Sequence, residues 1–171
     1  MAVSCGDVES VELEVAHVPP FYHAEATSAF MGKFNYEYSL AAAIVDHDVV
    51  QGTFSEEVRA RPEMRGALSR VRVLERPEKF SVENPRSAIV TVALKSGRVL
   101  TNEVRTVYGA ADDPLTQDDV VAKFRTNAIR ILADREIGQL VALLTNLDSA
   151  PIVDLMAMAR VPALARVLDP V

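Results

Sequence analysis

Lys33 and Tyr38 are the side chains in this sequence whose types and spacing best suit chemistry on a small anion. They lie at the point where an apolar helical pattern begins. A phenol on the first turns of a helix, with a cation just before it, can present its hydroxyl to a bound anion near the positive end of that helix. The alternative is that Tyr38 belongs to the core with its hydroxyl bonded locally, and spacing alone favours this alternative.

The other residues with reactive side chains form no pattern for catalysis or metal binding. His17 and His23 are separated by a Pro-Pro bend, and His47 is distant in sequence from both. Because paired His or Cys ligand motifs are absent, we predict no metal site and assign the histidines structural or exposed roles. Cys5 is the single cysteine, so an intrachain disulfide is excluded, and the sequence places no base beside it. Phosphate-binding Gly-rich loops and the Gly-x-Ser-x-Gly motif are also absent.

Charged residues are explained by solvation and helix ends. Several pairs of acids lie at expected turns or helix termini, where the helix dipole and water account for them: Asp46/Asp48, Glu56/Glu57, Asp112/Asp113 and Asp118/Asp119. Acids also interrupt a stretch of arginines, which we interpret as a solvated face: Arg59, Arg61, Arg65, Arg70 and Arg72.

The overall composition is that of an ordinary soluble globular protein. The chain has 171 residues, of which 49% are apolar and 25% charged, with a net charge of −6. This length supports one sizeable core. Scattered Lys and Arg argue against nucleic-acid and anionic-membrane binding. Apolar runs fall far short of the roughly 20 residues that cross a bilayer, and the N-terminus lacks the features of a signal peptide. We therefore expect a cytoplasmic protein without a membrane partner.

Hydrophobic periodicity predicts an α+β fold. Period-2 alternation predicts strands over 8–17 and 71–74, and a tight hairpin over 88–104 that turns at Gly97. Helical spacing predicts a helix over 34–46 and two short helices between 55 and 68. We expect an antiparallel sheet of about four strands, with helices packed on one face.

The C-terminal part of the chain is predicted to be helical. Thr116 stands three residues before Asp119, which is the spacing of a capping box, and apolar residues follow at helical intervals. We treat 1–171 as a single domain, with an α+β part over about 8–110 and C-terminal helices over about 116–168.

A set of ordered motifs resembles the MmgE/PrpD family. The longest motif runs over 33–46, and shorter ones follow in the family's order. The motifs are Lys33-Phe34-Asn35-Tyr36-Glu37-Tyr38-Ser39-Leu40-Ala41-Ala42-Ala43-Ile44-Val45-Asp46, then Thr53-Phe54, Arg70-Val71-Arg72-Val73, Val90-Thr91-Val92, Lys95-Ser96-Gly97-Arg98-Val99-Leu100-Thr101, Pro114-Leu115-Thr116, Lys123-Phe124-Arg125 and Leu144-Thr145-Asn146-Leu147-Asp148. The resemblance covers about 8–160 and concerns the smaller C-terminal α+β domain. The family's Asp-Gly after the first motif is Asp46-His47 here.

This resemblance implies a function in a metal-free and cofactor-free lyase or isomerase. Family members such as 2-methylcitrate dehydratase, cis-aconitate decarboxylase and iminodisuccinate epimerase move protons on carbon next to a carboxylate of a small polycarboxylate. In that reading, Tyr38 matches the family's catalytic tyrosine and Lys33 would bind a substrate carboxylate. A large helical domain carries most catalytic groups in the family, so we expect this chain to be inactive alone.

Two roles remain open. The chain would either complete an active site by docking onto a helical catalytic partner, or serve as a non-catalytic homo-oligomeric or partner-binding module. For the second role, the candidate interface is the apolar stripe over 137–167, which includes Met156 and Met158.

Overall fold

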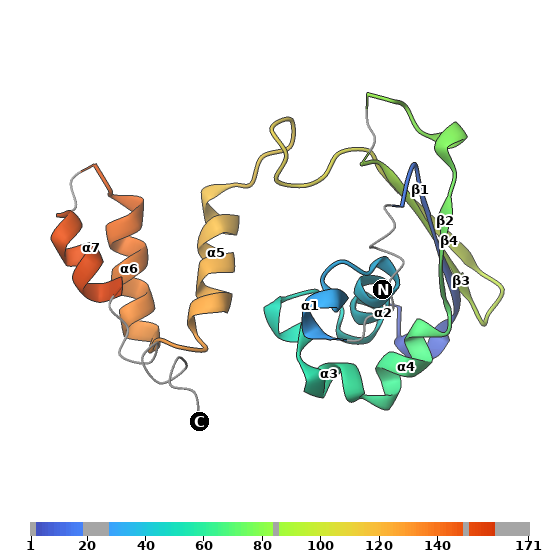
Figure 1. Cartoon of the computed structure of the whole chain (residues 1–171), viewed down its shortest axis with the longest axis horizontal. Helices are drawn as coiled ribbons and strands as arrows, with labels where there is room; N and C mark the ends of the chain where they lie inside the picture. Colours follow the sequence, from blue (N-terminus) through green and yellow to red (C-terminus); the bar gives the residue numbers. More distant parts are fainter. Residues whose placement is uncertain (1–2, 19–27, 84–85, 149–150, 160–171) are drawn as a thin grey trace. The chain divides into compact units, whose positions relative to one another are not determined.

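The computed structural model describes residues 3–18, 28–83, 86–148 and 151–159. The chain divides into two compact units, Met1–Asp113 and Pro114–Val171. The first unit contains a sheet and short helices, and the second is helical (Figure 1). Together these elements confirm the predicted α+β class.

The sheet of the first unit has four strands in the order β2-β1-β3-β4. Its strands are β1 (Val8–Val15), β2 (Val71–Glu75), β3 (Ala88–Leu94) and β4 (Val99–Val104). The predicted hairpin forms β3 and β4, with Val92 opposite Leu100. Gly97 adopts a φ of 82° in the turn, a conformation that glycine takes without strain.

The sheet is mixed, so the prediction of a purely antiparallel sheet was wrong in this respect. β1 pairs antiparallel with β3 but parallel with β2, with Val11 opposite Val71. The chain between β1 and β2 crosses over through helices, and a helical crossover is the connection that parallel neighbours require. Alternation of apolar and polar residues reports only which face is buried, so it could not reveal strand direction.

Four short helices are found among the described residues between β1 and β2. They are α1 (Ala29–Gly32), α2 (Tyr36–Asp46), α3 (Glu56–Ala60) and α4 (Pro62–Leu68), with the 3₁₀ turn η3 (Gln51–Phe54) between α2 and α3. The turns η1 (Cys5–Asp7) and η4 (Pro77–Lys79) flank the strands. Local residues explain where these helices begin. Asn35 and Ser55 accept backbone hydrogen bonds as the N-caps of α2 and α3, and Pro62 is the first residue of α4.

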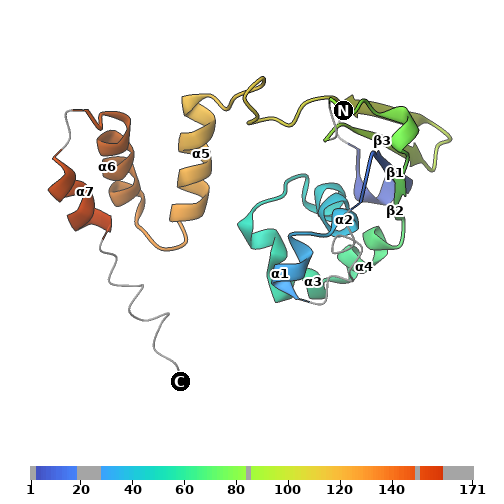
Figure 2. The same ribbon diagram turned by 45° about the horizontal axis from the view of Figure 1, so that its top comes forward.

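The helices cover one face of the sheet, as both views show (Figures 1 and 2). The core between them is formed by aliphatic strand residues and by apolar helix residues, which are Val8, Val11, Val71 and Leu94 on the strands and Tyr38, Ala41, Ala42, Met64 and Ala67 on the helices. Ala41 and Ala42 are completely buried, which lets α2 approach the sheet closely.

On β1, Glu14 is a buried carboxylate, only 8% exposed. Lys79 and Arg76 both form ion pairs with it, from the segment that follows β2. A buried carboxylate needs such partners, because removal from water strongly disfavours an unpaired charge. These ion pairs tie η4 to the central strand of the sheet.

The second unit contains α5 (Gln117–Ala128), α6 (Asp134–Thr145) and α7 (Ile152–Ala159). The predicted capping box is confirmed, since Thr116 and Asp119 each accept a hydrogen bond from the other's backbone N–H. Ile137 and Leu140 are buried. Among the residues that the structure describes, every helix is too short or too polar to cross a bilayer. The part of the predicted C-terminal helices beyond 159 lies outside the described residues.

Candidate functional site

Tyr38 lies in the first turn of α2 and is almost completely buried, with 1% of its surface exposed. Its backbone N–H donates to Asn35 Oδ1 at 2.7 Å, which fixes the start of the helix. Its hydroxyl donates to the backbone carbonyl of Thr53 at 2.6 Å. The tyrosine therefore joins α2 to η3, and its hydroxyl proton is engaged in that bond.

The Tyr38 ring is held between two neighbouring segments. The ring of Phe54 packs against it, with the ring centres 5.8 Å apart. Gly32, at the end of α1, lies close to the rings of both Tyr38 and Phe54. A Cβ atom at that position would be 3.3 Å from Phe54 Cδ1 and 3.6 Å from Tyr38 Cδ1. The absence of a side chain at Gly32 is what allows α1 to approach so closely.

The positive charges of two nearby arginines act on the Tyr38 hydroxyl. Burial raises the pKa of Tyr38 above its ordinary value, while the charges of Arg59 and Arg61 act to lower the pKa and burial prevails. The phenol is accordingly neutral at neutral pH. Each arginine has an acidic partner, Glu56 for Arg59 and Asp46 for Arg61. The hydrogen bond to Asp46 raises the pKa of Arg61, so that guanidinium stays charged.

Lys33 follows α1 directly and is exposed. Its backbone N–H donates to the carbonyl of Phe30 at 3.2 Å, which closes the short helix. The phenyl ring of Phe30 lies edge-on against Phe34, with ring centres 5.1 Å apart. The predicted site residues are thus on adjacent elements, with the lysine in solvent and the tyrosine enclosed.

The remaining reactive residues are dispersed. His17 pairs with Glu75 at 2.7 Å on the surface, and His23 lies outside the described residues. His47 ends α2 with a φ of 58°, the left-handed conformation usually taken by glycine at a helix C-terminus. The turn thus forms with histidine in place of glycine. Cys5 is half-buried. Within the described ranges, no three His, Cys, Asp or Glu residues come together in a way that could hold a metal ion.

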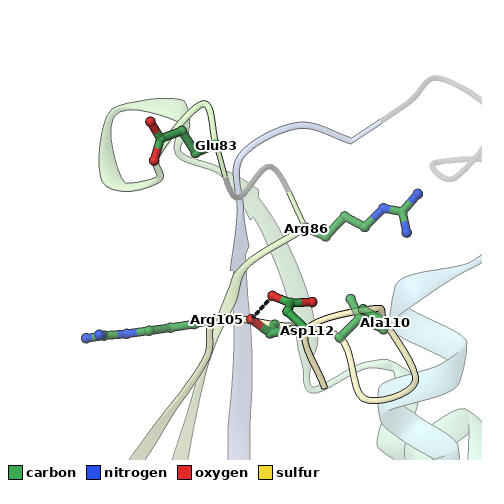
Figure 3. Close-up of a pocket in the computed structure, with 7 residues that line it drawn as sticks. Glu83, Arg86, Arg105, Ala110 and Asp112 are labelled. Carbon is green, nitrogen blue, oxygen red and sulfur yellow. Dashed lines mark hydrogen bonds between the residues drawn. The ribbon is translucent and has the colours of Figure 1, made fainter. Parts of the chain in front are cut away.

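A small cavity of about 150 Å³, lined by both charged and apolar residues, lies beside the hairpin in the first unit (Figure 3). Its two arginines, Arg86 and Arg105, point in opposite directions, and Arg105 is paired with Glu103. Thr106 donates a hydrogen bond to Asp112 at its wall. Because the cations diverge and a carboxylate lines the space, this cavity is poorly suited to bind an anionic substrate.

The second unit carries an apolar groove of about 280 Å³ between α5 and α6. The groove is lined by Gln117, Val120, Val121, Phe124, Val141, Leu144 and Thr145. Within the stripe predicted as an interface, Ile137 is buried inside the unit, whereas Leu147 and Met156 are exposed. The residues of that stripe beyond 159 are not described.

Sequence reasoning missed the burial of Arg59. The interpretation of the arginine stretch as a solvated face holds for Arg65, which is exposed, but the Arg59 side chain is only 15% exposed. Arg59 and Arg65 belong to the same arginine-rich stretch, in which Glu63 is the one acid, so charge pattern alone could not distinguish the two. The one available signal was proximity to Thr53-Phe54, a motif of the resemblance.

Comparison with known proteins supports the resemblance over most of the chain. A family model described as the MmgE/PrpD C-terminal domain matches residues 2–147. Human cis-aconitate decarboxylase is similar over 141 residues at 26% identity, and the mouse cis-aconitate decarboxylase over 141 residues at 23% identity. In both cases the match covers 82% of this chain and 29% of the relative. The chain therefore corresponds to less than a third of the length of these relatives.

Proposed function

Because the chain belongs to the MmgE/PrpD family, we propose that it acts as the C-terminal domain of a lyase or isomerase that moves a proton next to a carboxylate of a small polycarboxylate. The match to the family's C-terminal domain over residues 2–147 is the observation that carries this proposal. Similarity to two cis-aconitate decarboxylases favours decarboxylation among the family's reactions.

In this proposal, Tyr38 is the proton donor or hydrogen-bond partner of the substrate. Burial raises the pKa of Tyr38, so the proton remains on the oxygen at neutral pH, and this suits hydrogen-bond donation to the substrate more than complete proton transfer. The hydroxyl must first exchange its bond to Thr53 for a bond to the substrate. That exchange requires η3 to shift, and the residues that lead into this turn, 46–50, are exposed and lightly packed.

Lys33 would supply positive charge for a substrate carboxylate. It is exposed and lies two residues before Asn35, the N-cap of α2. Proton transfer from carbon also needs a base and groups that stabilise an enolate-like charge. We infer that a helical domain of the kind found in the family supplies these groups, which makes the isolated chain inactive.

The test is turnover of cis-aconitate, 2-methylcitrate, citrate and iminodisuccinate by the purified chain, with and without a separately produced helical domain of a relative. We expect activity only in the mixture, and loss of that activity in Tyr38→Phe. Activity of the chain alone would disprove the need for a helical partner. Unchanged turnover by Tyr38→Phe in an active mixture would remove the tyrosine from the chemistry.

A second candidate is a non-catalytic module that binds a partner or a second copy of itself. The apolar groove between α5 and α6 favours it, since exposed apolar surface of this kind is typical of interaction sites. The Tyr38–Thr53 hydrogen bond would then be purely structural. Mass measurement in solution discriminates the two: a stable dimer that stays silent in the turnover experiment supports the module, whereas a monomer activated by the helical domain supports the enzyme.

A further inference from the structure

We propose that Arg59 is a carboxylate-binding residue beside Tyr38, and that Glu56 occupies its guanidinium until a substrate carboxylate displaces it. The chemical class of the ligand rests on the proposed function. The assignment of Arg59 and Glu56 rests on their burial and on the geometry of their ion pair.

The first observation is the burial of the Arg59 side chain. Only 15% of it is exposed, compared with 38% for Arg61 two residues later. A guanidinium keeps its charge at any pH that a folded protein experiences, so a buried one requires an anionic partner. Arg59 is therefore a position where this fold holds a largely buried guanidinium that can pair with a carboxylate.

The second observation is that Glu56, an ion-pair partner of Arg59, is largely exposed to water. The Glu56 side chain is 74% exposed, and both of its oxygens contact the same nitrogen, Arg59 Nη1, at 2.8 Å. This contact differs from the two-nitrogen fork that a guanidinium forms with a well-matched carboxylate. An exposed ion pair between residues three apart contributes little to stability, so a carboxylate that replaces Glu56 must offset chiefly the hydrogen bond that Glu56 accepts from the backbone N–H of Ala29.

The pair formed by Arg61 and Asp46 serves as an internal comparison. There the two oxygens meet two different nitrogens, at 2.8 and 3.3 Å, and the Asp46 side chain is only 28% exposed. This pair ties the end of α2 to the start of α4, so its role is structural. Of the two acids, Glu56 is the more exposed, so it is the one that a ligand carboxylate reaches more readily.

The third observation is the position of Arg59 relative to the tyrosine. Phe54 packs on the Tyr38 ring, and the next residue, Ser55, caps the helix that carries Arg59. The positive charge of Arg59 acts on the Tyr38 hydroxyl, as the direction of its effect on the pKa records. Glu56 also accepts a hydrogen bond from the backbone N–H of Ala29 at the start of α1. Displacement of Glu56 would therefore loosen α1 as well, the helix that lies against the ring.

The test is titration of the wild-type chain and its variants with cis-aconitate, followed by ¹H–¹⁵N NMR at the amides of α3 and α2. Arg59→Gln should weaken binding about ten- to hundredfold, because it removes a charge-assisted hydrogen bond. Glu56→Gln should strengthen binding about two- to fivefold, because it removes the competing carboxylate. Arg65→Gln is the matched control: it removes one positive charge from an exposed position and should change binding less than twofold.

The outcomes separate this inference from the proposed function. Equal binding by Arg59→Gln and Arg65→Gln, with the wild type bound, overturns the role of Arg59 and leaves the proposed function standing. Absence of binding by both the wild type and Glu56→Gln also overturns it, while turnover in the mixture with a helical domain decides the proposed function separately. If the amide spectrum shows that Arg59→Gln is unfolded, tighter binding by Glu56→Gln supports the inference and unchanged binding refutes it.

Discussion

Replacement of Tyr38 by Phe tests whether the hydroxyl belongs to the core or to a site. The change removes one oxygen and leaves the ring packed on Phe54. It also removes the donor that lies 2.6 Å from the buried carbonyl of Thr53, a residue 4% exposed. Loss of a partner by a buried polar group costs about 1–3 kcal/mol. With a denaturant dependence of about 2 kcal/mol per molar urea, the unfolding midpoint should fall by about 0.5–1.5 M.

Urea unfolding of the wild-type chain and of Tyr38→Phe, followed by far-UV circular dichroism at pH 7, measures this difference. A loss of less than about 0.5 kcal/mol, below the usual range for such a bond, would refute the reasoning. It would mean that the hydroxyl spends little time on Thr53 in solution. That result would favour a hydroxyl already available to a substrate.

The same variant also gives a pH dependence with a defined sign. Burial raises the pKa of Tyr38 in the folded state, whereas the unfolded value is about 10. A group whose pKa is raised on folding contributes stability that is fully present below its unfolded pKa and is lost as the pH rises above it. The wild-type advantage over Tyr38→Phe should therefore shrink from pH 9 toward pH 11. Parallel stability curves over this interval would contradict the raised pKa.

The remaining predictions concern backbone conformation and a buried ion pair, and urea unfolding measures each of them. His47→Gly should stabilise the chain by about 0.5–1 kcal/mol, because it relieves a left-handed conformation at a helix end; no gain would mean that the turn is unstrained. Gly66→Ala should gain about 0.5–1 kcal/mol, since a Cβ there meets open space within α4, whereas Gly32→Ala should gain nothing because of its contact with Phe54; equal gains would disprove the close approach. Glu14→Gln should cost about 1–3 kcal/mol, because Lys79 and Arg76 lose their buried carboxylate; a neutral change would show that the ion pairs are not formed in solution.

Elements with a long periodic signal could be predicted from the sequence. The alternating valines of β1, the alanine-rich α2 and the hairpin around Gly97 all formed where the pattern placed them. By contrast, α1 has only four residues, which is about one turn, and no periodicity can be detected over that length. Its formation depends on the local cap by Ser28 and on the close approach of Gly32 to the Tyr38 ring, and the second of these is a tertiary fact.

The sequence predicted which residues form the candidate site, but it could not predict which groups the fold places around them. Spacing indicated that Tyr38 begins a helix whose inner face is apolar, and its ring does lie in the core. Its partner Thr53 is 15 residues away and contributes a backbone carbonyl, which carries no sequence signal. The low exposure of the Arg59 side chain likewise depends on how α1 and α3 pack together. The local charge pattern contains no information about that contact. The roles of Tyr38 and Lys33 toward a substrate stay predictions.

The mixed sheet also sets an order for folding. Its central strand, β1, precedes both of its neighbours: Val11 pairs with Val71 and Val92, which lie 60 and 81 residues further along the chain. The β3–β4 hairpin is local and can close on its own, but β1 has no partner until the second half of the first unit is available. Because contacts between distant residues are slow to form, we expect assembly around β1 to limit the folding rate. During synthesis, the valine-rich strand β1 lacks one of its two partner strands until β3 has left the ribosome. We expect the nascent chain to be most prone to aggregation during this interval.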